Sequence, residues 1–172
     1  MNYNLFSIIS SKLKNSQIKS ICLLKDKKWK FGIKSQIKWY KKNIKKNDIH
    51  NLFYIKSKLV GYTLLRKRTY EIRSLNKRTN YLLFDTLIID KKYRGKKLSN
   101  LLMSFNNTII NQSGYFSFLI CERELISFYK KNKWIKVNNK NINIIDHLFS
   151  SNGMILNMKD VNKRKHYFYV NK

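Results

Sequence analysis

The stretch that most constrains the fold runs from an apolar segment through a basic turn into a helical pattern. Residues 81–90, YLLFDTLIID, are almost continuously apolar, which is typical of a strand covered on both faces. The turn KKYRGKK follows. Apolar residues then recur at steps of three and four: Leu98, Leu101, Leu102, Phe105 and Ile109. Gly114 is well placed to end this helix. A strand, a short turn and a helix in this order predict a layered α/β fold.

The rest of the chain has the same mixed character. Upstream we expect a strand, two helices and a tightly connected pair of strands: 3–10, 17–27, 33–44, 52–56 and 59–68 or beyond. Downstream we expect a strand, a short helix and three further strands: 115–122, 122–133, 134–137, 153–158 and 166–170. This order indicates an α/β mixed sheet with helices on both faces. No repeat or linker marks a boundary, so residues 1–172 are expected to form a single domain.

Charge bounds the possible partners. The chain has 37 basic and 9 acidic residues, which gives a formal net charge of +28. Such a field favours polyanions: nucleic acid, an anionic membrane surface or a phosphate-bearing cofactor. Lys, Asn and Ile dominate while Pro is absent, however, which is also the composition expected of an AT-rich genome. Net charge alone is therefore poor evidence for nucleic-acid binding.

Cysteine usage and hydropathy exclude other classes. Cys22 and Cys121 are far apart, with no CxxC motif and no nearby His cluster, so we expect two buried thiols, no disulfide framework and no metal site. The first residues lack the basic region of a signal peptide. No apolar stretch approaches the roughly 20 residues of a membrane helix. The sequence predicts a cytoplasmic protein.

The basic turn has two interpretations. It could be a solvated turn in a chain that is basic everywhere. Alternatively, the first amides of the following helix, which have no partner within the helix, could bind an anion with help from the helix dipole. Gly95 would let the backbone approach such an anion closely, and Arg94, Lys96 and Lys97 would add charge. The turn alone leaves both interpretations open.

The spacing around the turn resembles a known family. LIIDKKYRGKKLSNLLM is similar to the acetyl-CoA loop of the GNAT N-acetyltransferase superfamily, whose pattern runs Arg/Gln-x-x-Gly-x-Gly/Ala after a strand. Arg94 matches the first position, and Ser99 is a small residue at the last. Lys97 stands where the family usually has Gly.

Two further segments carry the resemblance. ELISFYKKNKW looks like the family's A-x-x-F/L-Y-x-x-x-G-F/W segment, with its aromatic positions occupied by Phe128, Tyr129 and Trp134. Lys133 replaces the usual Gly, and Glu122 stands where many members carry Asn. LVGYTLL, with Gly61, looks like the family's third strand. The three segments occur in the family's order, and the resemblance covers residues 51–137.

The resemblance implies a fold and an activity. The fold would be a GNAT-like central mixed, mainly antiparallel twisted sheet of about six or seven strands with helices on both faces. The activity would be direct transfer of an acetyl group from acetyl-CoA, as co-substrate, to a primary amine of a small molecule. The pantetheine arm would pair with the main chain of Leu87, Ile88 and Ile89. The pyrophosphate would be bound by main-chain amides of Arg94, Gly95, Lys96, Lys97, Leu98 and Ser99.

The resemblance also implies a general acid. Tyr129 would protonate the departing CoA thiolate, because a tyrosine with a pKa near ~10 is protonated at neutral pH. The alternative is a core aromatic, since the chain has 11 tyrosines.

Asp85 is the candidate general base. It lies inside an apolar strand, on the same side as Leu83 and Leu87, where burial would raise the pKa of the carboxyl toward that of a useful base. The alternative is a carboxylate paired for structural reasons. His50 and His147 are weaker candidates, because a lone histidine is more often structural.

The acceptor and two other functions stay open. A protein with this charge disfavours polycationic acceptors, so an anionic or neutral amino sugar is the favoured acceptor. The basic hairpin 66–78 is interpreted as solvated, although it could steer an anionic acceptor or contact RNA by interleaving Tyr70 among cations. The chain could instead be a basic nucleic-acid-binding protein. It could also bind CoA without catalysis, because Lys97 and Lys133 replace two glycines.

Overall fold

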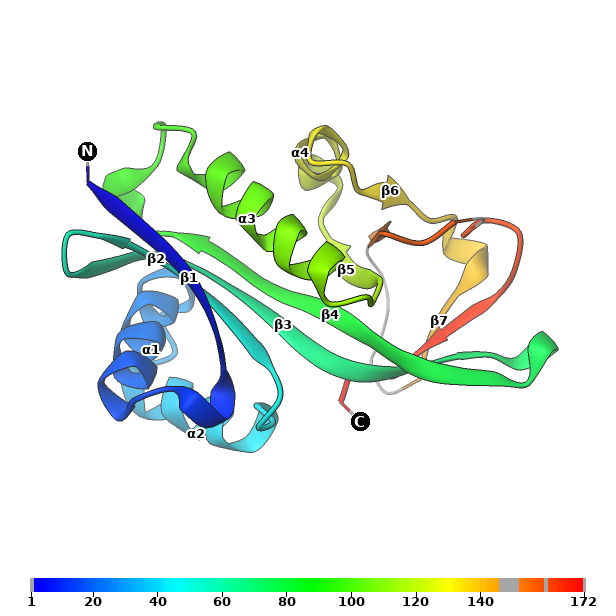
Figure 1. Cartoon of the computed structure of the whole chain (residues 1–172), viewed down its shortest axis with the longest axis horizontal. Coiled ribbons are helices and arrows are strands. Elements are labelled where there is room, and N and C mark those ends of the chain that lie inside the picture. Colours follow the sequence, from blue (N-terminus) through cyan, green and yellow to red (C-terminus); the bar gives the residue numbers. More distant parts are fainter. Residues whose placement is uncertain (1, 146–151, 160, 172) are drawn as a thin grey trace. The chain divides into compact units, whose positions relative to one another are not determined.

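The computed structural model describes residues 2–145, 152–159 and 161–171 (Figure 1). Contacts divide the chain into two units. Unit 1 contains residues 1–66 and 86–106, and unit 2 contains residues 67–85 and 107–172. Two strands and one helix contribute to both units: β3 (Lys58–Ile72), β4 (Lys77–Ile89) and α3 (Leu98–Gln112). The single domain expected from the sequence stays a prediction.

Unit 1 is built on an antiparallel ladder. β1 (Tyr3–Ile9) pairs with β2 (Ile49–Ile55), and β2 pairs with the first part of β3. The segment between β1 and β2 forms two helices, α1 (Asn15–Trp29) and α2 (Ile33–Asn43). Short 3-10 turns occur at Ser10–Lys12 and, after β4, at Lys91–Tyr93.

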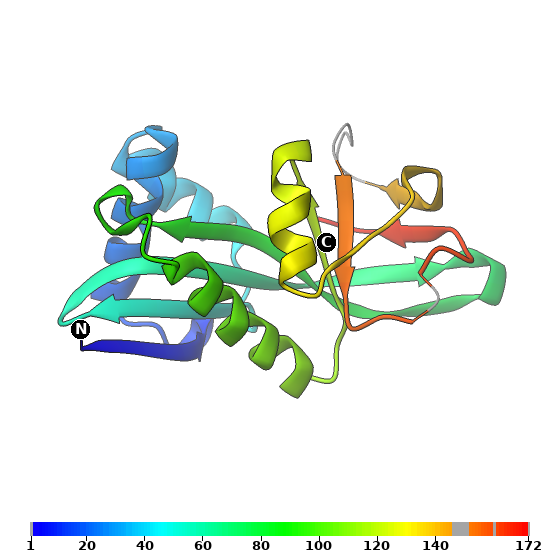
Figure 2. The same ribbon diagram turned by 90° about the horizontal axis from the view of Figure 1, so that it is seen from above.

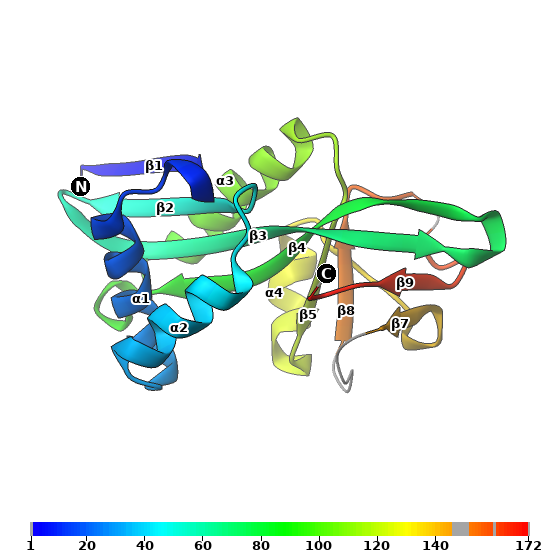
Figure 3. The ribbon, with the colours of Figure 1, turned by 90° about the horizontal axis from the view of Figure 1, so that it is seen from below.

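Period-two alternation divides the core of unit 1 between the two faces of its sheet. On one face, Ile21 and Leu24 of α1 pack with strand residues Leu52, Leu59, Tyr62, Leu64 and Ile88. The other packs against the start of α3 and contains Phe53, Ile55, Val60, Ile89 and Leu102. Figures 1 and 3 show α1 and α2 on the opposite side of these strands from α3. Helices therefore cover both faces, as expected.

Gly61 lies where helix and sheet approach closely. A Cβ atom at this position would lie 2.8 Å from Cδ1 of Ile89 and 3.2 Å from Cδ2 of Leu102. Both atoms belong to the core that positions the β4–α3 loop. The glycine in LVGYTLL therefore leaves room for the side chains of Ile89 and Leu102, which would have to shift if a Cβ atom were added.

Unit 2 contains the parallel pairing of β4. β4 pairs with β5 (Ser117–Cys121) through Leu82↔Ser117 and Leu83↔Phe118. β5 then pairs antiparallel with β8 (Asn152–Leu156), which pairs with β6 (Ile135–Lys136). Between β5 and β6 lie a 3-10 turn, Arg123–Leu125, and α4 (Ile126–Lys131), visible beside β5 in Figure 2.

A second group of strands completes unit 2. The distal part of β3 pairs with β9 (His166–Phe168), and β9 runs parallel to β7 (Ile142–Ile144). Short 3-10 turns occur at Arg73–Leu75 and Asn139–Asn141. The core of this unit is rich in aromatic residues and contains Tyr70, Tyr81, Leu83, Phe118, Val137, Ile142, Ile155, Val161 and Phe168.

The expected order of elements is confirmed. In the part of the chain that the structure describes, the sheet has nine strands rather than six or seven, and most neighbouring strands are antiparallel. The additional short strand β7 was not predicted, and His147 lies outside the described residues. Among the helices that the structure describes, none combines the length and apolarity needed to cross a membrane.

Candidate functional site

The loop between β4 and α3 is anchored at its start by Asp90. Its amide donates a hydrogen bond to the carbonyl of Val60 at 2.8 Å. Its carboxylate accepts hydrogen bonds from Nζ of Lys27 at 2.7 Å and from the amide of Lys92 at 3.1 Å. One buried side chain therefore joins α1 to the first turn of the loop.

The ionised form of Asp90 is favoured. Burial by itself would raise the pKa of the carboxyl, but the hydrogen bonds from Lys27 and Lys92 and the charges of Lys27 and Lys58 outweigh it and lower the pKa. The anchor is thus charged at neutral pH.

The backbone of the loop alternates in handedness. Gly95 has a φ of 80° and Lys97 a φ of 55°, whereas the intervening Lys96 does not have a positive φ. Successive residues of opposite hand turn their amides toward one concavity, an arrangement that binds anions in many proteins.

The amides of residues 95–99, here called the cradle, have no hydrogen-bond acceptor among the described residues. The next two amides, of Asn100 and Leu101, donate to the carbonyl of Lys97 at 3.1 and 3.3 Å. The amide of Arg94 donates to the carbonyl of Lys91 at 3.3 Å, and Nε of the Arg94 side chain donates to the carbonyl of Ile89 at 3.2 Å. The cradle therefore offers five consecutive amides, and Arg94 positions the loop through its own bonds.

The surroundings of the cradle are positive. Arg94, Lys96 and Lys97 are exposed. The acidic residues of unit 1 are engaged locally, since Asp26 accepts from the amide of Gly32 at 2.7 Å and Asp48 from the amide of Lys45 at 2.9 Å. The start of α3 adds the positive end of the helix dipole. The loop can therefore bind an anion such as a pyrophosphate.

The strand before the loop contributes to both cores of unit 1. Ile88 packs on the α1 side and Ile89 on the α3 side, while Leu87 is half-buried. The pairing of their main chain with a pantetheine arm stays a prediction. Leu98 and Ser99 begin α3 and are also half-buried.

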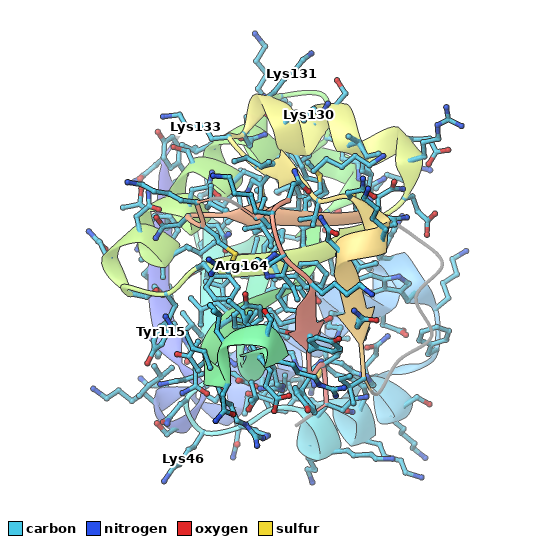
Figure 4. All side chains as sticks on the ribbon, turned by 90° about the vertical axis from the view of Figure 1, so that its right-hand side faces the viewer. Lys46, Tyr115, Lys130, Lys131, Lys133 and Arg164 are labelled. Atoms are coloured by element: carbon cyan, nitrogen blue, oxygen red, sulfur yellow. The ribbon has the colours of Figure 1, made fainter. Side chains whose placement is uncertain are left out.

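Both lysines that replace family glycines adopt the backbone conformation that favours glycine. Lys97 has a φ of 55° and Lys133 a φ of 69°. The structure thus retains the local geometry of the motif despite the change of residue, with the conformational strain of a side chain at positive φ. Figure 4 shows Lys133 at the surface, near Lys130 and Lys131 of α4.

Replacing Lys133 with glycine should stabilise the protein by about 0.5–1 kcal/mol, because relief of the positive-φ strain exceeds the entropy that glycine loses on folding. Lys97→Gly should act in the same direction. Lys131→Gly is the matched control, since this exposed lysine lies in the last turn of α4, where glycine should cost up to about 1 kcal/mol. Urea unfolding measures the free energy of unfolding of all three variants. A lower free energy of unfolding in Lys133→Gly than in the native protein would contradict the proposed backbone strain at this position.

The ring of Tyr129 is buried among other aromatic side chains. Its ring centroid lies 5.3, 6.1 and 6.2 Å from those of Phe128, Trp134 and Phe84. Among the described residues the hydroxyl has no hydrogen-bond partner, yet its oxygen is not completely enclosed. Tyr129 therefore has a polar group that the local structure does not use.

Burial strongly raises the pKa of Tyr129, and the nearby Cys121 thiol adds to the shift. The hydroxyl consequently keeps its proton across the physiological range. Such a group donates a proton or hydrogen bond to an anion that forms beside it.

Asn107 holds the segment that follows Tyr129. Its Nδ2 donates to the carbonyl of Asn132 at 2.8 Å, and its Oδ1 accepts from Nε1 of Trp134 at 3.1 Å. The amide of Trp134 in turn donates to the carbonyl of Tyr129 at 3.1 Å. Sequence reasoning missed this residue, although a pair of asparagines within an apolar helical pattern was a usable signal.

The expected burial of Asp85 is wrong. The residue is exposed, although Phe84 and Thr86 on either side are buried. Of its two neighbours on the same side, Leu83 is buried and Leu87 is half-buried, so the burial of this side of β4 is interrupted at Asp85. The desolvation argument for Asp85 as a base no longer applies, and its role stays a prediction.

The other candidates have structural surroundings. His50 is fully buried; Nε2 lies 2.7 Å from Oγ of Ser10 and Nδ1 lies 2.8 Å from the hydroxyl of Tyr62. Tyr70, which the less favoured interpretation of the hairpin placed among surface cations, is 2% exposed, and its hydroxyl lies 2.6 Å from Nδ1 of His166, because it faces the core. Within the described residues, no group of three His, Cys, Asp or Glu side chains could hold a metal ion.

Comparisons with known proteins identify the fold. No family model and no curated protein sequence matches the chain. Among solved structures, the GNAT-family N-acetyltransferase YhbS of Escherichia coli in complex with CoA matches with a TM-score of 0.66, 12% identity, and coverage of 99% of this chain and 91% of that chain. Escherichia coli ElaA matches with a TM-score of 0.62, 18% identity, and coverage of 90% and 99%. The PaiA N-acetyltransferase of Thermoplasma acidophilum in complex with coenzyme A matches with a TM-score of 0.58 and 16% identity, and the match covers 90% of this chain and 98% of that chain. The chain therefore has the GNAT fold, as the sequence motifs predicted.

Proposed function

We propose that this protein is an acyltransferase that moves an acetyl group from acetyl-CoA to the primary amine of a small molecule by direct transfer. The observation that carries the proposal is the cradle: five consecutive amides that have no acceptor within the described part of the chain, in a positive field after β4. The fold supports it, because solved structures of the same fold include N-acetyltransferases in complex with CoA.

The chain's own groups suit the parts of this ligand. The cradle would bind the pyrophosphate through its amides, and Arg94, Lys96 and Lys97 would add charge. The main chain of Leu87 to Ile89 would pair with the pantetheine arm. With the pyrophosphate at the cradle, the pantetheine arm would run back along β4, so the acyl thioester would lie upstream of Leu87.

The chemistry requires two proton movements. Acetyl-CoA, when bound, supplies an activated thioester. A neutral amine forms a C–N bond with its carbonyl carbon while the C–S bond breaks, and the electron pair of that bond leaves with sulfur. Tyr129 would act toward this thiolate through its hydroxyl, which has no hydrogen-bond partner among the described residues. Burial keeps the hydroxyl protonated but also makes it a weak acid, so it would stabilise the departing sulfur first by donating a hydrogen bond, and the proton would be transferred only against the raised pKa. Asp85, or water, would take the proton that the amine loses.

The charge of unit 1 narrows the acceptor. Its acidic residues, Asp26, Asp48 and Asp90, all accept hydrogen bonds from main-chain amides or Lys27. We infer that a polycationic acceptor is disfavoured and that an anionic or neutral amine, such as an amino sugar, is the acceptor class.

Thermal unfolding with and without acetyl-CoA tests the proposal. A ligand at 100 times its dissociation constant should add about 2.7 kcal/mol of stability. Lys96→Glu should reduce this gain by placing a negative charge at the cradle. Lys92→Glu is the matched control, because it changes another exposed lysine whose amide already donates to Asp90.

Each outcome separates the candidate functions. A gain of stability that Lys96→Glu reduces more than Lys92→Glu, followed by thiol release with an amine acceptor, supports the enzyme. The same gain without turnover on any amine favours the CoA-binding protein without catalysis. No gain with acetyl-CoA or CoA would overturn both.

A further inference from the structure

β9 and the residue that follows it carry two tyrosines on the outer side. Strand alternation turns His166 and Phe168 into the core of unit 2, where they are 3% and 0% exposed. Tyr167 and Tyr169, on either side of Phe168, are therefore directed outward and are half-buried. Two residues along a strand correspond to roughly 7 Å, which is the separation expected for the Cα atoms of the two tyrosines.

Each of these tyrosines has an arginine over its ring. The guanidinium of Arg73 lies 4.1 Å from the ring centroid of Tyr167, and that of Arg78 lies 5.6 Å from that of Tyr169. Glu71 organises the group: its carboxylate accepts from the Tyr169 hydroxyl at 3.0 Å and lies 3.8 and 3.5 Å from Nε of Arg73 and Arg78. The planar groups are thus positioned by contacts within the protein.

Further cations border the two pairs. Exposed basic residues occur at the start of β4 and in the turn before β9: Lys77, Lys163, Arg164 and Lys165. Figure 4 labels Arg164. Among the described residues 67–80 and 161–171, Glu71 is the acidic residue, and it already contacts both arginines. The surface therefore combines planar groups with an excess of positive charge.

We infer that this surface, here called the β9 face (Arg73, Arg78, Tyr167 and Tyr169), binds single-stranded nucleic acid. Unpaired bases stack on tyrosine rings and on guanidinium planes, and the bordering cations contact the phosphates. A membrane is the less suitable partner, because the exposed apolar side chain at the adjacent hairpin tip is a single leucine, Leu75. The inference goes beyond the proposed acyl transfer and uses none of its residues.

Fluorescence anisotropy with labelled oligouridine and oligothymidine of about 16 nucleotides tests the inference at about 150 mM salt. The native protein should bind at least one of the two, and comparing them distinguishes RNA from DNA. Tyr167→Ala combined with Tyr169→Ala should weaken binding at least about tenfold, the effect of losing stacking on two bases. Tyr3→Ala is the matched control, since Tyr3 is an exposed tyrosine of unit 1, 51% exposed.

The charged half of the surface needs its own control. Arg73→Ala with Arg78→Ala should weaken binding more than Arg123→Ala with Lys136→Ala, which removes the same charge from exposed positions elsewhere in unit 2. If the two double variants lost the same binding affinity, binding would depend on net charge alone and the inference would be overturned. Unchanged affinity in the double tyrosine variant, with thermal unfolding like that of the native protein, would also overturn it. Tighter binding to phosphatidylserine vesicles than to either oligonucleotide would overturn it in favour of a membrane.

Discussion

Lowering the pH from about 7 to about 4 should destabilise this protein by about 3 kcal/mol through one side chain, His50. Burial, with a smaller contribution from Lys25, lowers the pKa of His50 from 6.5 to about 3. The unfolded chain binds a proton at His50 once the pH falls below about 6.5, whereas the folded chain does not until about 3. The free energy of unfolding therefore falls across this window, by about 1.4 kcal/mol for each pH unit.

Urea unfolding at several pH values measures this effect. His50→Gln preserves a polar side chain but removes the titrating group, so its stability should be lower at pH 7 and much less dependent on pH. Asp90 does not confuse the comparison, because its lowered pKa contributes stability that is lost only as the pH falls below the ordinary value near 3.9. His166, whose pKa burial also lowers, titrates in both proteins and cancels in the difference. If the free energy of unfolding fell equally with pH in the native protein and in His50→Gln, the prediction would be contradicted.

The main elements were predictable because local patterns and tertiary packing agree. The helical pattern from Leu98 to Ile109 corresponds to α3, and the apolar run 81–90 corresponds to the buried part of β4. Gly114 ends α3 with a φ of 72°, as its position suggested. β7 was missed because Ile142–Ile144 is a three-residue strand stabilised by pairing with β9, and pairing between distant segments leaves little local signal.

Burial of polar residues was the part that sequence could not predict. Asp85 and Tyr70 both lie in long strands, and alternation constrains which residues share a face without showing how well each face is covered. Asp85 is exposed although Leu83 on the same side of β4 is buried, whereas Tyr70, paired with Phe168 of β9, is buried. The outward tyrosines 167 and 169 take the place among cations that the hairpin sequence had suggested for Tyr70.

The two lysines at glycine positions show why a motif can persist without its usual residue. A consensus records the residue that best fits a backbone conformation, but the conformation itself is stabilised by the surrounding contacts. At Lys133 those contacts include the hydrogen bonds of Asn107 to the residues on either side, Asn132 and Trp134. The motif comparison could therefore identify the segment, while only the structure shows that its geometry is retained.

Tyr129→Phe should lower turnover by about 10²–10⁴-fold while leaving stabilisation by acetyl-CoA intact. The substitution removes only the hydroxyl, which has no hydrogen-bond partner among the described residues, so the packing against Phe84, Phe128 and Trp134 should survive. Without the phenolic proton, the thiolate would have to leave unprotonated or wait for water. Thiol release with a reactive amine measures turnover, and thermal unfolding with acetyl-CoA measures binding.

Tyr115→Phe is the matched control, because it removes a hydroxyl that bonds to Lys67 at 2.7 Å in the same unit. It should leave turnover nearly unchanged. The pH profile separates a chemical role of Tyr129 from a structural one: burial keeps the phenol protonated far above pH 10, so the native enzyme should show no loss of activity from this group up to the highest pH at which it stays folded. The variant should depend on the proton supply from solvent and slow as the pH rises. Unchanged turnover in Tyr129→Phe would remove this residue from the mechanism, while the cradle and its ligand would still be tested independently by the stability measurements.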